Sequence, residues 1–151
     1  MLRPWSPSRS GRGRRCLQAF EGELGSHLYG LLWPDWRSAQ ARAVEAACRE
    51  PENDVWVAVV DGRPVGLVVV RWVNEDAARV GEISMIAVDP AHQNAGLGTS
   101  LMERAVTEIR ARSVDLAVIA TGGDPGHAPA RALYEKFDFK PLAQVRYYLE
   151  L

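Results

Sequence analysis

The sequence has 151 residues, of which 47% are apolar and 25% charged, and this composition predicts one globular domain with a sizeable core. The net charge of −1 hides an asymmetry, because residues 1–15 carry five of the 18 basic residues and none of the 19 acidic ones, which leaves 13 against 19, or −6, for residues 16–151. No apolar run is long enough to cross a bilayer, and two cysteines without metal-ligand spacing predict no metal site. We therefore expect a soluble, cytoplasmic protein without a membrane partner.

Residues 1–15 are predicted to form an arm separate from the domain at 16–151. The arm is rich in Arg, Ser and Gly, so it can bury little apolar surface and is expected to be solvated and poorly ordered. A transit peptide and a nucleic-acid-binding arm are alternatives. The second would need more aromatic residues or a wider basic face, so we expect no nucleic-acid partner.

Two helices are predicted next. Apolar residues recur at spacings of three and four over 17–33, where two glycines weaken the continuity of the helix. The stretch 38–50 has alanines and a valine on one helical face, with Ser38 as a candidate cap and Pro51 beyond its end.

Two β-branched runs, 54–60 and 63–73, predict antiparallel strands. They are joined by Asp61-Gly62, a dipeptide that readily adopts positive φ and therefore favours a hairpin. A third strand is expected over 82–88. It ends before Pro90, which has no N–H to donate to a ladder.

The rest of the chain alternates helices and strands. A helix is predicted from Leu97 to about residue 111, then a buried strand over 114–121, a helix that begins near Pro129, and a last strand over 143–151. The order predicts a mixed α/β domain with a strand, loop, helix and strand unit at its centre.

The loop of that unit, "QNAGLG" at 93–98, stands between the carboxyl end of a strand and the start of a helix. Backbone N–H groups without partners and the helix dipole favour an anion there, and glycines at 96 and 98 permit a phosphate to come close. A flexible turn is the alternative interpretation. The loop lacks the Gly-Lys-Ser/Thr end of a P-loop and the three glycines of a dinucleotide fingerprint.

Gln93-Asn94-Ala95-Gly96-Leu97-Gly98 instead fits Arg/Gln-x-x-Gly-x-Gly/Ala, the pyrophosphate motif of the GCN5-related N-acetyltransferases, a family that binds coenzyme A. The chain resembles this family from about 55 to 140, since "GEISMIAVDP" and "ARALYEKFDF" are also similar to its pattern. The resemblance implies a single-domain α/β (α+β) fold, with about four helices around a mixed, mostly antiparallel sheet that splays at the parallel strands 82–88 and 114–120.

The resemblance also implies acetyl-CoA as cosubstrate, with pantetheine in the gap between the parallel strands. The cofactor-binding residues that we predict are Ile86, Ala87, Val88, Gln93, Asn94, Ala95, Gly96, Leu97, Gly98, Thr99, His127 and Tyr134. Backbone N–H groups at Ile86, Ala87 and Val88 would polarise the thioester carbonyl if the strand bulges there. His127 stands where the family often has an asparagine that touches pantetheine.

Two residues are predicted to be catalytic. An alkylammonium has a reference pKa near ~10.4, so a base must remove a proton before attack, and the resemblance places Glu82 in that role through ordered water. The alternative for Glu82 is an ordinary edge carboxylate. Tyr134 corresponds to the general-acid tyrosine of the family, with a packed core aromatic as the alternative. Its pKa near ~10 exceeds that of a thiol, near ~8.5, so a hydrogen bond to the leaving sulfur is as plausible as full proton donation.

The acceptor is expected to be a primary amine of a small molecule or peptide, and the acidic body suits a cationic amine. Tyr29, Trp33 and Trp36 are interpreted mainly as core, and Asp124 and His127 as residues that face the substrate. Asp138, where the family prefers glycine, is expected in a left-handed conformation. A non-catalytic acyl-CoA-binding or regulatory module is the alternative function, and a homodimer is an open alternative to a monomer.

Overall fold

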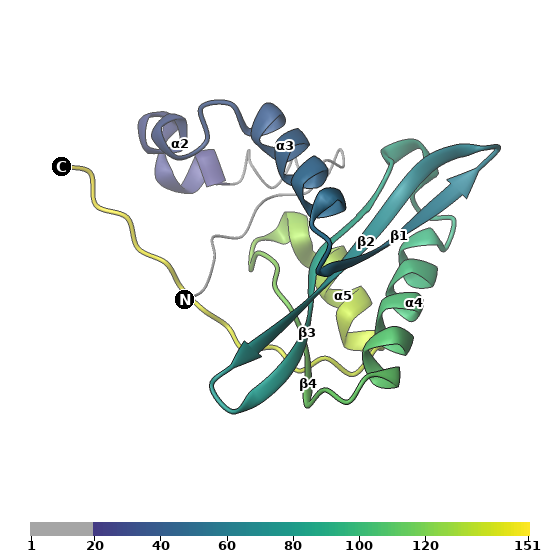
Figure 1. Cartoon of the computed structure of the whole chain (residues 1–151). Helices are drawn as coiled ribbons and strands as arrows, with labels where there is room; N and C mark the ends of the chain where they lie inside the picture. Colours follow the sequence, from purple (N-terminus) through teal and green to yellow (C-terminus); the bar gives the residue numbers. More distant parts are fainter. Residues whose placement is uncertain (1–19) are drawn as a thin grey trace.

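A four-stranded sheet in the order β1-β2-β3-β4 organises the part of the chain that this computed structural model describes, residues 20–151 (Figure 1). Three antiparallel strands are followed by one that pairs in parallel with β3: β1 (Asn53–Val60), β2 (Arg63–Glu75), β3 (Ala78–Val88) and β4 (Leu116–Ile119). The predicted mixed, mostly antiparallel sheet is confirmed. The predicted arm at 1–15 lies outside the described residues.

Both β-hairpins turn through residues with positive φ. Asp61 (φ 50°) and Gly62 (φ 73°) join β1 to β2, as the dipeptide predicts. The second hairpin turns at Asp76 (φ 50°), so β3 begins at Ala78, earlier than the predicted start at residue 82. The residues around this hairpin are mostly polar, so no apolar alternation predicted a strand there. They nevertheless pair in the ladder, which begins with Glu75 opposite Ala78.

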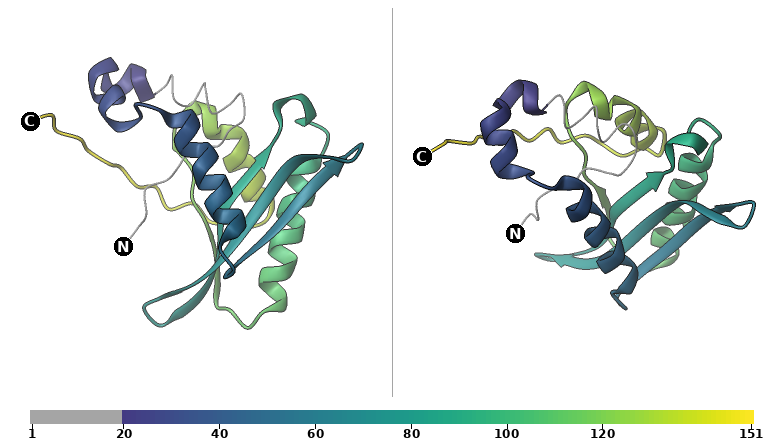
Figure 2. Two further views of the ribbon diagram at one scale, coloured as in Figure 1. Left: turned by 45° about the horizontal axis from the view of Figure 1, so that its top comes forward. Right: turned by 90° about the horizontal axis from the view of Figure 1, so that it is seen from above.

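The helices lie on both faces of the sheet, with α3 on one face and α4 and α5 on the other (Figure 2). Their bounds, with those of two short 3-10 turns, are α2 (Ser26–Leu32), α3 (Trp36–Arg49), η1 (Pro90–His92), α4 (Leu97–Ala111), η2 (Pro125–His127) and α5 (Ala128–Lys136). Residues 20–24 are also helical. The predicted helix over 17–33 is interrupted at Gly25, whose φ of 80° is left-handed. The cap of α3 is Asp35, not Ser38, because the Asp35 carboxylate accepts from Ser38 N at 3.3 Å.

The core lies between α4 and the sheet. Its buried residues come from β2, β3, α4 and α5: Val68, Val70, Ile83, Leu101, Met102, Ala105, Val106, Ile109 and Tyr134. Each large aliphatic side chain buried there contributes about 1.5–3 kcal/mol. This packing fixes the start of α4 at the carboxyl end of β3, which is where the candidate site is.

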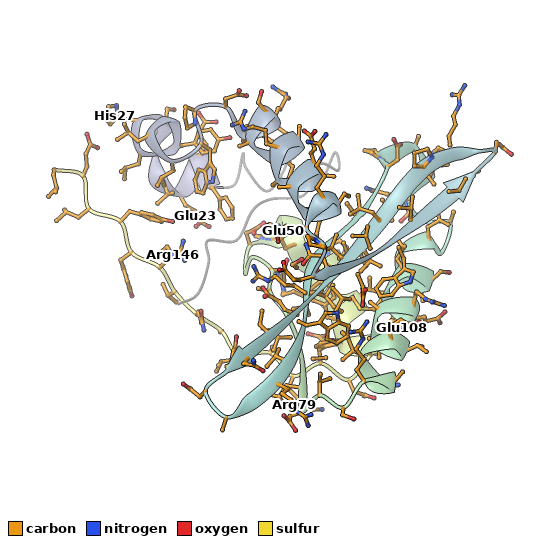
Figure 3. All side chains as sticks on the ribbon, viewed as in Figure 1. Glu23, His27, Glu50, Arg79, Glu108 and Arg146 are labelled. Atoms are coloured by element: carbon orange, nitrogen blue, oxygen red, sulfur yellow. The ribbon has the colours of Figure 1, made fainter. Side chains whose placement is uncertain are left out.

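The predicted last strand over 143–151 is wrong. Residues 139–151 belong to no strand, and most of their large apolar side chains are exposed: Leu142, Val145, Tyr147, Leu149 and Leu151. The tail runs past α2, where His27 Nε2 lies 3.0 Å from Glu150 Oε1 (Figure 3). Alternation of apolar residues favours a strand, but a strand forms only where a neighbouring strand pairs with it, and the sequence pattern does not show whether one is present.

Asp138, at the end of α5, has a φ of 64°, which confirms its predicted left-handed conformation. Within residues 20–151 no helix combines the length and apolar character that crossing a bilayer requires.

Candidate active site

The loop between β3 and α4 is held at both ends. Gln93 Nε2 donates to Val88 O at 3.0 Å, which ties the loop back to the last residue of β3. Asn94 (φ 63°) and Gly96 (φ 80°) are both left-handed, and Gly96 is the N-cap of α4. These two conformations turn the chain sharply enough to start the helix directly beneath the strand end.

The first turn of α4 presents unpaired donors. Gly96 makes no side-chain capping bond, and within residues 20–151 the N–H groups of Leu97, Gly98 and Thr99 have neither an intrahelical nor a side-chain partner. A Cβ at Gly96 would meet nothing within 4 Å, and one at Gly98 would come no closer than 3.8 Å to Leu133 Cδ2. Neither glycine is needed for packing inside the protein, so open space in front of the N–H groups fits an anion such as pyrophosphate.

Strands β3 and β4 stop pairing and separate beside this loop. Their ladder ends at Ile83 opposite Ile119, while Ile86, Ala87 and Val88 remain paired with β2 on their other side. Successive N–H groups of a strand point to opposite edges, so at least one of these three faces the edge that β4 has left.

β3 has no bulge at Ile86–Val88, the condition under which a free donor was expected there. The extra residue is Ser84, which lies between the partners of Val69 and Val70, and its Oγ lies 3.5 Å from Val69 O, to which it donates. A donor on this edge therefore arises from the end of the β3–β4 ladder and not from a bulge at residues 86–88.

Tyr134 projects from α5 into the core and is 9% exposed. Burial raises the pKa of its hydroxyl above the usual value, and a hydrogen bond shared with the Thr121 side chain, just beyond β4, partly offsets this. A raised pKa keeps the hydroxyl protonated. The residue is thus both a core aromatic and an O–H donor at the end of β4.

Glu82 lies in the part of β3 that still pairs with both neighbours. Its Oε2 accepts from Arg71 Nε at 3.1 Å and from Arg71 Nη2 at 2.5 Å, across the β2–β3 ladder. The side chain is 30% exposed. The sequence reasoning did not foresee this ion pair.

The loop after β4 contains a buried, hydrogen-bonded pair of side chains, Asp124 and His127. Asp124 Oδ2 contacts His127 Nδ1, and Asp124 Oδ1 accepts from Gly126 N at 2.9 Å. Arg131 of α5 closes the loop, because its Nη1 donates to Gly122 O at 2.7 Å and to Asp124 O at 2.8 Å.

Aromatic residues from the N-terminal helices reach this loop. The Phe20 ring stacks at 6.3 Å from the His127 ring and at 5.6 Å from Trp33, which in turn lies 5.5 Å from Tyr29. Tyr29, Trp33 and Trp36 are only half-buried and none belongs to the core cluster, so their interpretation as core was wrong. Among the described residues, no cluster of three or more His, Cys, Asp or Glu side chains could hold a metal ion.

Residues 11–139 match the Acetyltransferase (GNAT) family. The chain belongs to this family. The predicted resemblance is therefore confirmed, and the acetyltransferase class that it implies is supported.

Curated relatives of this GNAT chain are larger proteins. It is 39% identical to the mycothiol acetyltransferase of Beutenbergia cavernae over 89 residues, which are 59% of this chain and 29% of the relative. It is 29% identical to that of Saccharomonospora viridis over 122 residues, 70% of this chain and 38% of the relative. The chain thus spans about a third of their length.

Solved structures share the fold of the GNAT chain at low identity. A variant of the BH1408 protein from Bacillus halodurans has a TM-score of 0.64 and 18% identity, covering 91% of this chain and 88% of that one. The aminoglycoside N-acetyltransferase AAC(6')-Iy in complex with CoA has a TM-score of 0.60 and 15% identity, covering 77% and 90%. These neighbours confirm the predicted fold.

The structure places most of the predicted site residues around the ends of β3 and β4, and the residues that hold them there were not predicted. The loop 93–99 is contiguous and begins α4, and Tyr134 and His127 both lie near the loop after β4. Arg71 and Arg131 were missed, since neither has a local signal. Asp124-Pro125-Gly126 could have been read as a capped turn, because Asp before Pro is a common start of one.

Proposed function

We propose that this chain is an acetyl-CoA-dependent N-acetyltransferase that transfers an acetyl group to a primary amine of a small molecule or peptide, with both substrates bound together. The observation that carries the proposal is the uncapped first turn of α4, with open space at Gly96 and Gly98, next to the point where β3 and β4 separate. Family membership supports it.

Bound acetyl-CoA would supply an activated acetyl group as a thioester. The N–H groups of Leu97, Gly98 and Thr99 would donate to its pyrophosphate oxygens, and Asn94 and Ala95 would shape the approach. An N–H among Ile86, Ala87 and Val88 would donate to the acyl oxygen.

Tyr134 would donate its O–H to the departing sulfur. Since burial raises the pKa of this hydroxyl, full proton transfer to a thiolate costs more than the roughly 2 kcal/mol implied by the reference values of ~10 and ~8.5. A hydrogen bond is therefore its main contribution, and the Thr121 side chain orients it.

The acceptor would be a cationic amine. The charge of −6 on residues 16–151 favours approach of a cation, and the aromatic faces of Phe20 and Trp33 suit an ammonium group. The names of the mycothiol and aminoglycoside acetyltransferases point to small molecules as acceptors of those proteins. The base that the sequence predicts is Glu82, acting through water, but its Oε2 already accepts from Arg71 Nε and Nη2.

Native mass spectrometry of the full chain with and without acetyl-CoA tests cofactor binding and also reports whether a homodimer forms. Acceptor-dependent thiol release is then measured with spermidine, glucosamine, tyramine and glycylglycine. We expect one bound acetyl-CoA per chain and turnover on at least one amine. Binding without turnover on any amine, unchanged in Tyr134→Phe, would favour the non-catalytic module, and no binding would contradict both functions.

A further inference from the structure

Asp124 and His127 form a buried, hydrogen-bonded pair on the loop after β4. We propose that it forms a dyad that takes the proton from the acceptor's ammonium group, with His127 as the base and Asp124 as its positioning residue. This inference rests on the proposed N-acetyltransferase function and names the group that prepares the amine.

Asp124 is held so that it can orient the imidazole. One carboxylate oxygen contacts His127 Nδ1 and the other accepts from Gly126 N, while the side chains of Asp124 and His127 are only 3% and 10% exposed. A carboxylate at Nδ1 selects the tautomer with the proton on Nδ1, so Nε2 carries the lone pair. The same carboxylate stabilises the imidazolium that forms when Nε2 takes up a proton.

The backbone beside Asp124 and His127 leaves no space for an additional side-chain atom at Gly122. A Cβ on Gly122 would lie 2.6 Å from His127 Nδ1 and closer still to Asp124 Oδ2, so only glycine leaves room for the contact. Arg131, the charged group of α5 beside this loop, binds the carbonyls of Gly122 and Asp124. Burying polar side chains costs free energy unless they are hydrogen-bonded, and the extent of the support given to this one pair points to a chemical use.

The dyad shares its loop with the group that holds Tyr134. Thr121, which is hydrogen-bonded to the Tyr134 hydroxyl, lies on the same loop as Asp124, and the Phe20 ring stacks on the imidazole of His127. Glu82, by contrast, gives one oxygen to both Arg71 donors.

The proton and electron balance is complete with these groups. Nε2 of His127 takes one proton from the ammonium, which frees the nitrogen lone pair. The lone pair forms the C–N bond as the C–S bond breaks, and the sulfur leaves with the electron pair of that bond. The second proton lost by the nitrogen ends on the sulfur, next to the Tyr134 hydroxyl, and the imidazolium returns its proton to solvent.

The test uses the full chain and whichever of spermidine, glucosamine or tyramine turns over fastest. His127→Gln and Asp124→Asn are expected to lower kcat about 100-fold near pH 7, because the first removes the base and the second imposes the wrong tautomer. The loss in His127→Gln should shrink to about tenfold or less near pH 9.5, where more of the amine has already lost its proton. The dissociation constant for acetyl-CoA, measured by native mass spectrometry, should change far less than kcat, because His127 offers at most one polar contact to pantetheine and neither change touches the first turn of α4.

Two control variants show whether the loss of kcat is specific to the dyad. His27→Gln changes an exposed histidine of α2 and should leave kcat and its pH dependence unaltered. Glu82→Gln should lose less than the dyad variants. The dyad would be overturned by a wild-type kcat in a folded His127→Gln variant, or by a loss of kcat that does not shrink with rising pH. In either case, turnover by the parent chain would leave the proposed function standing. Absence of turnover by the parent would instead contradict the function.

A measurement on the unsubstituted chain tests the dyad even if the variants fail to fold. Nitrogen NMR of the chain labelled with ¹⁵N-histidine, near neutral pH, should give His127 a protonated Nδ1 and an acceptor-type Nε2, and His27 and His92 serve as references. A proton on Nε2 of neutral His127 would overturn the assignment.

Discussion

Two turns of nearly the same sequence follow the neighbouring parallel strands: Asp89-Pro90-Ala91-His92 after β3 and Asp124-Pro125-Gly126-His127 after β4. In both, the aspartate accepts from the N–H two residues on, at 2.8 Å and 2.9 Å, and a 3-10 turn follows. Four residues of local sequence therefore produce the same backbone twice.

The surroundings of the two turns differ. Asp89 and His92 are 52% and 38% exposed and lie 3.6 Å apart, whereas Asp124 and His127 are buried and in direct contact. The helices that follow also differ, since α4 begins with Leu-Gly-Thr and α5 with Ala-Pro-Ala, and Pro129 has no N–H to offer. Local sequence makes the two turns alike, and tertiary packing buries the Asp–His pair of the second turn only.

The largest effect is expected from Gly122→Ala, which removes the room for the buried pair. The new Cβ would displace the imidazole or the carboxylate, so kcat should fall about 100-fold and the free energy of unfolding by about 1–3 kcal/mol. Gly123→Ala is the matched control, because a Cβ there meets nothing within 4 Å. Steady-state kinetics and urea unfolding measure both, and equal behaviour of the two variants would contradict the prediction.

Gly98→Asp tests the other helix start. A carboxylate in the first turn of α4 would repel pyrophosphate by about 1.4 kcal/mol or more at close range, so the dissociation constant for acetyl-CoA should rise at least about tenfold. Gly98→Ala is the control, since its Cβ would sit 3.8 Å from Leu133 Cδ2 and the chain should fold normally. Gly98 is a cleaner position than Gly96, whose left-handed φ adds backbone strain to any substitution. Unchanged acetyl-CoA binding in folded Gly98→Asp would make the loop a turn and no more.

Removing each capping aspartate compares the turns directly. Asp89→Ala should cost about 1 kcal/mol of unfolding free energy, the usual loss of a cap. Asp124→Ala should cost about 1–2 kcal/mol more, because it leaves a buried imidazole N–H without its acceptor. Urea unfolding at one pH measures the difference, and similar losses would mean that burial adds nothing to the second turn.

The parts of the site that the sequence predicted are those with local causes. Positive φ at Asp61 and Gly62, and the helix start behind the glycines, follow from neighbouring residues alone, whereas positive φ at Asp138 was predicted from the family resemblance. The pairing of Arg71 with Glu82 depends on strand register, and the Arg131 contacts depend on how α5 docks. Neither can be read from a window of a few residues.

The same distinction explains the errors. The C-terminal stretch has the alternation of a strand, but no described strand accepts it as a partner. The bulge of β3 lies at Ser84 and not at Ile86–Val88, and no local pattern predicts it, because its position is set by the register between β2 and β3. The half-buried aromatics near Phe20 were assigned to the core on hydrophobicity alone, which does not tell a core from a site wall.

Tyr134, held by the loop that carries the buried turn, predicts an alkaline effect on stability. Its pKa is raised in the folded chain by burial, so the unfolded chain loses this proton first as the pH rises above about 10. Stability is therefore complete below pH ~10 and falls as the pH approaches the folded value, by at most about 1.4 kcal/mol per pH unit. Urea midpoints between about pH 8 and 11 should fall less in Tyr134→Phe. An equal fall in both proteins would assign the alkaline loss to other groups.

The smallest effect is expected from His92→Gln, the counterpart of His127→Gln in the exposed turn. His92 is 3.6 Å from Asp89, and an exposed ion pair contributes about 0–1 kcal/mol, so unfolding should change by less than that and kcat by less than about threefold. The backbone of the turn should persist, because Asp89 rather than His92 makes the capping bond. Measurement of kcat for His92→Gln at two pH values tests this expectation. A pH-dependent loss as large as that of His127→Gln would mean that the two turns share one role, and burial of the second would then not be what distinguishes them.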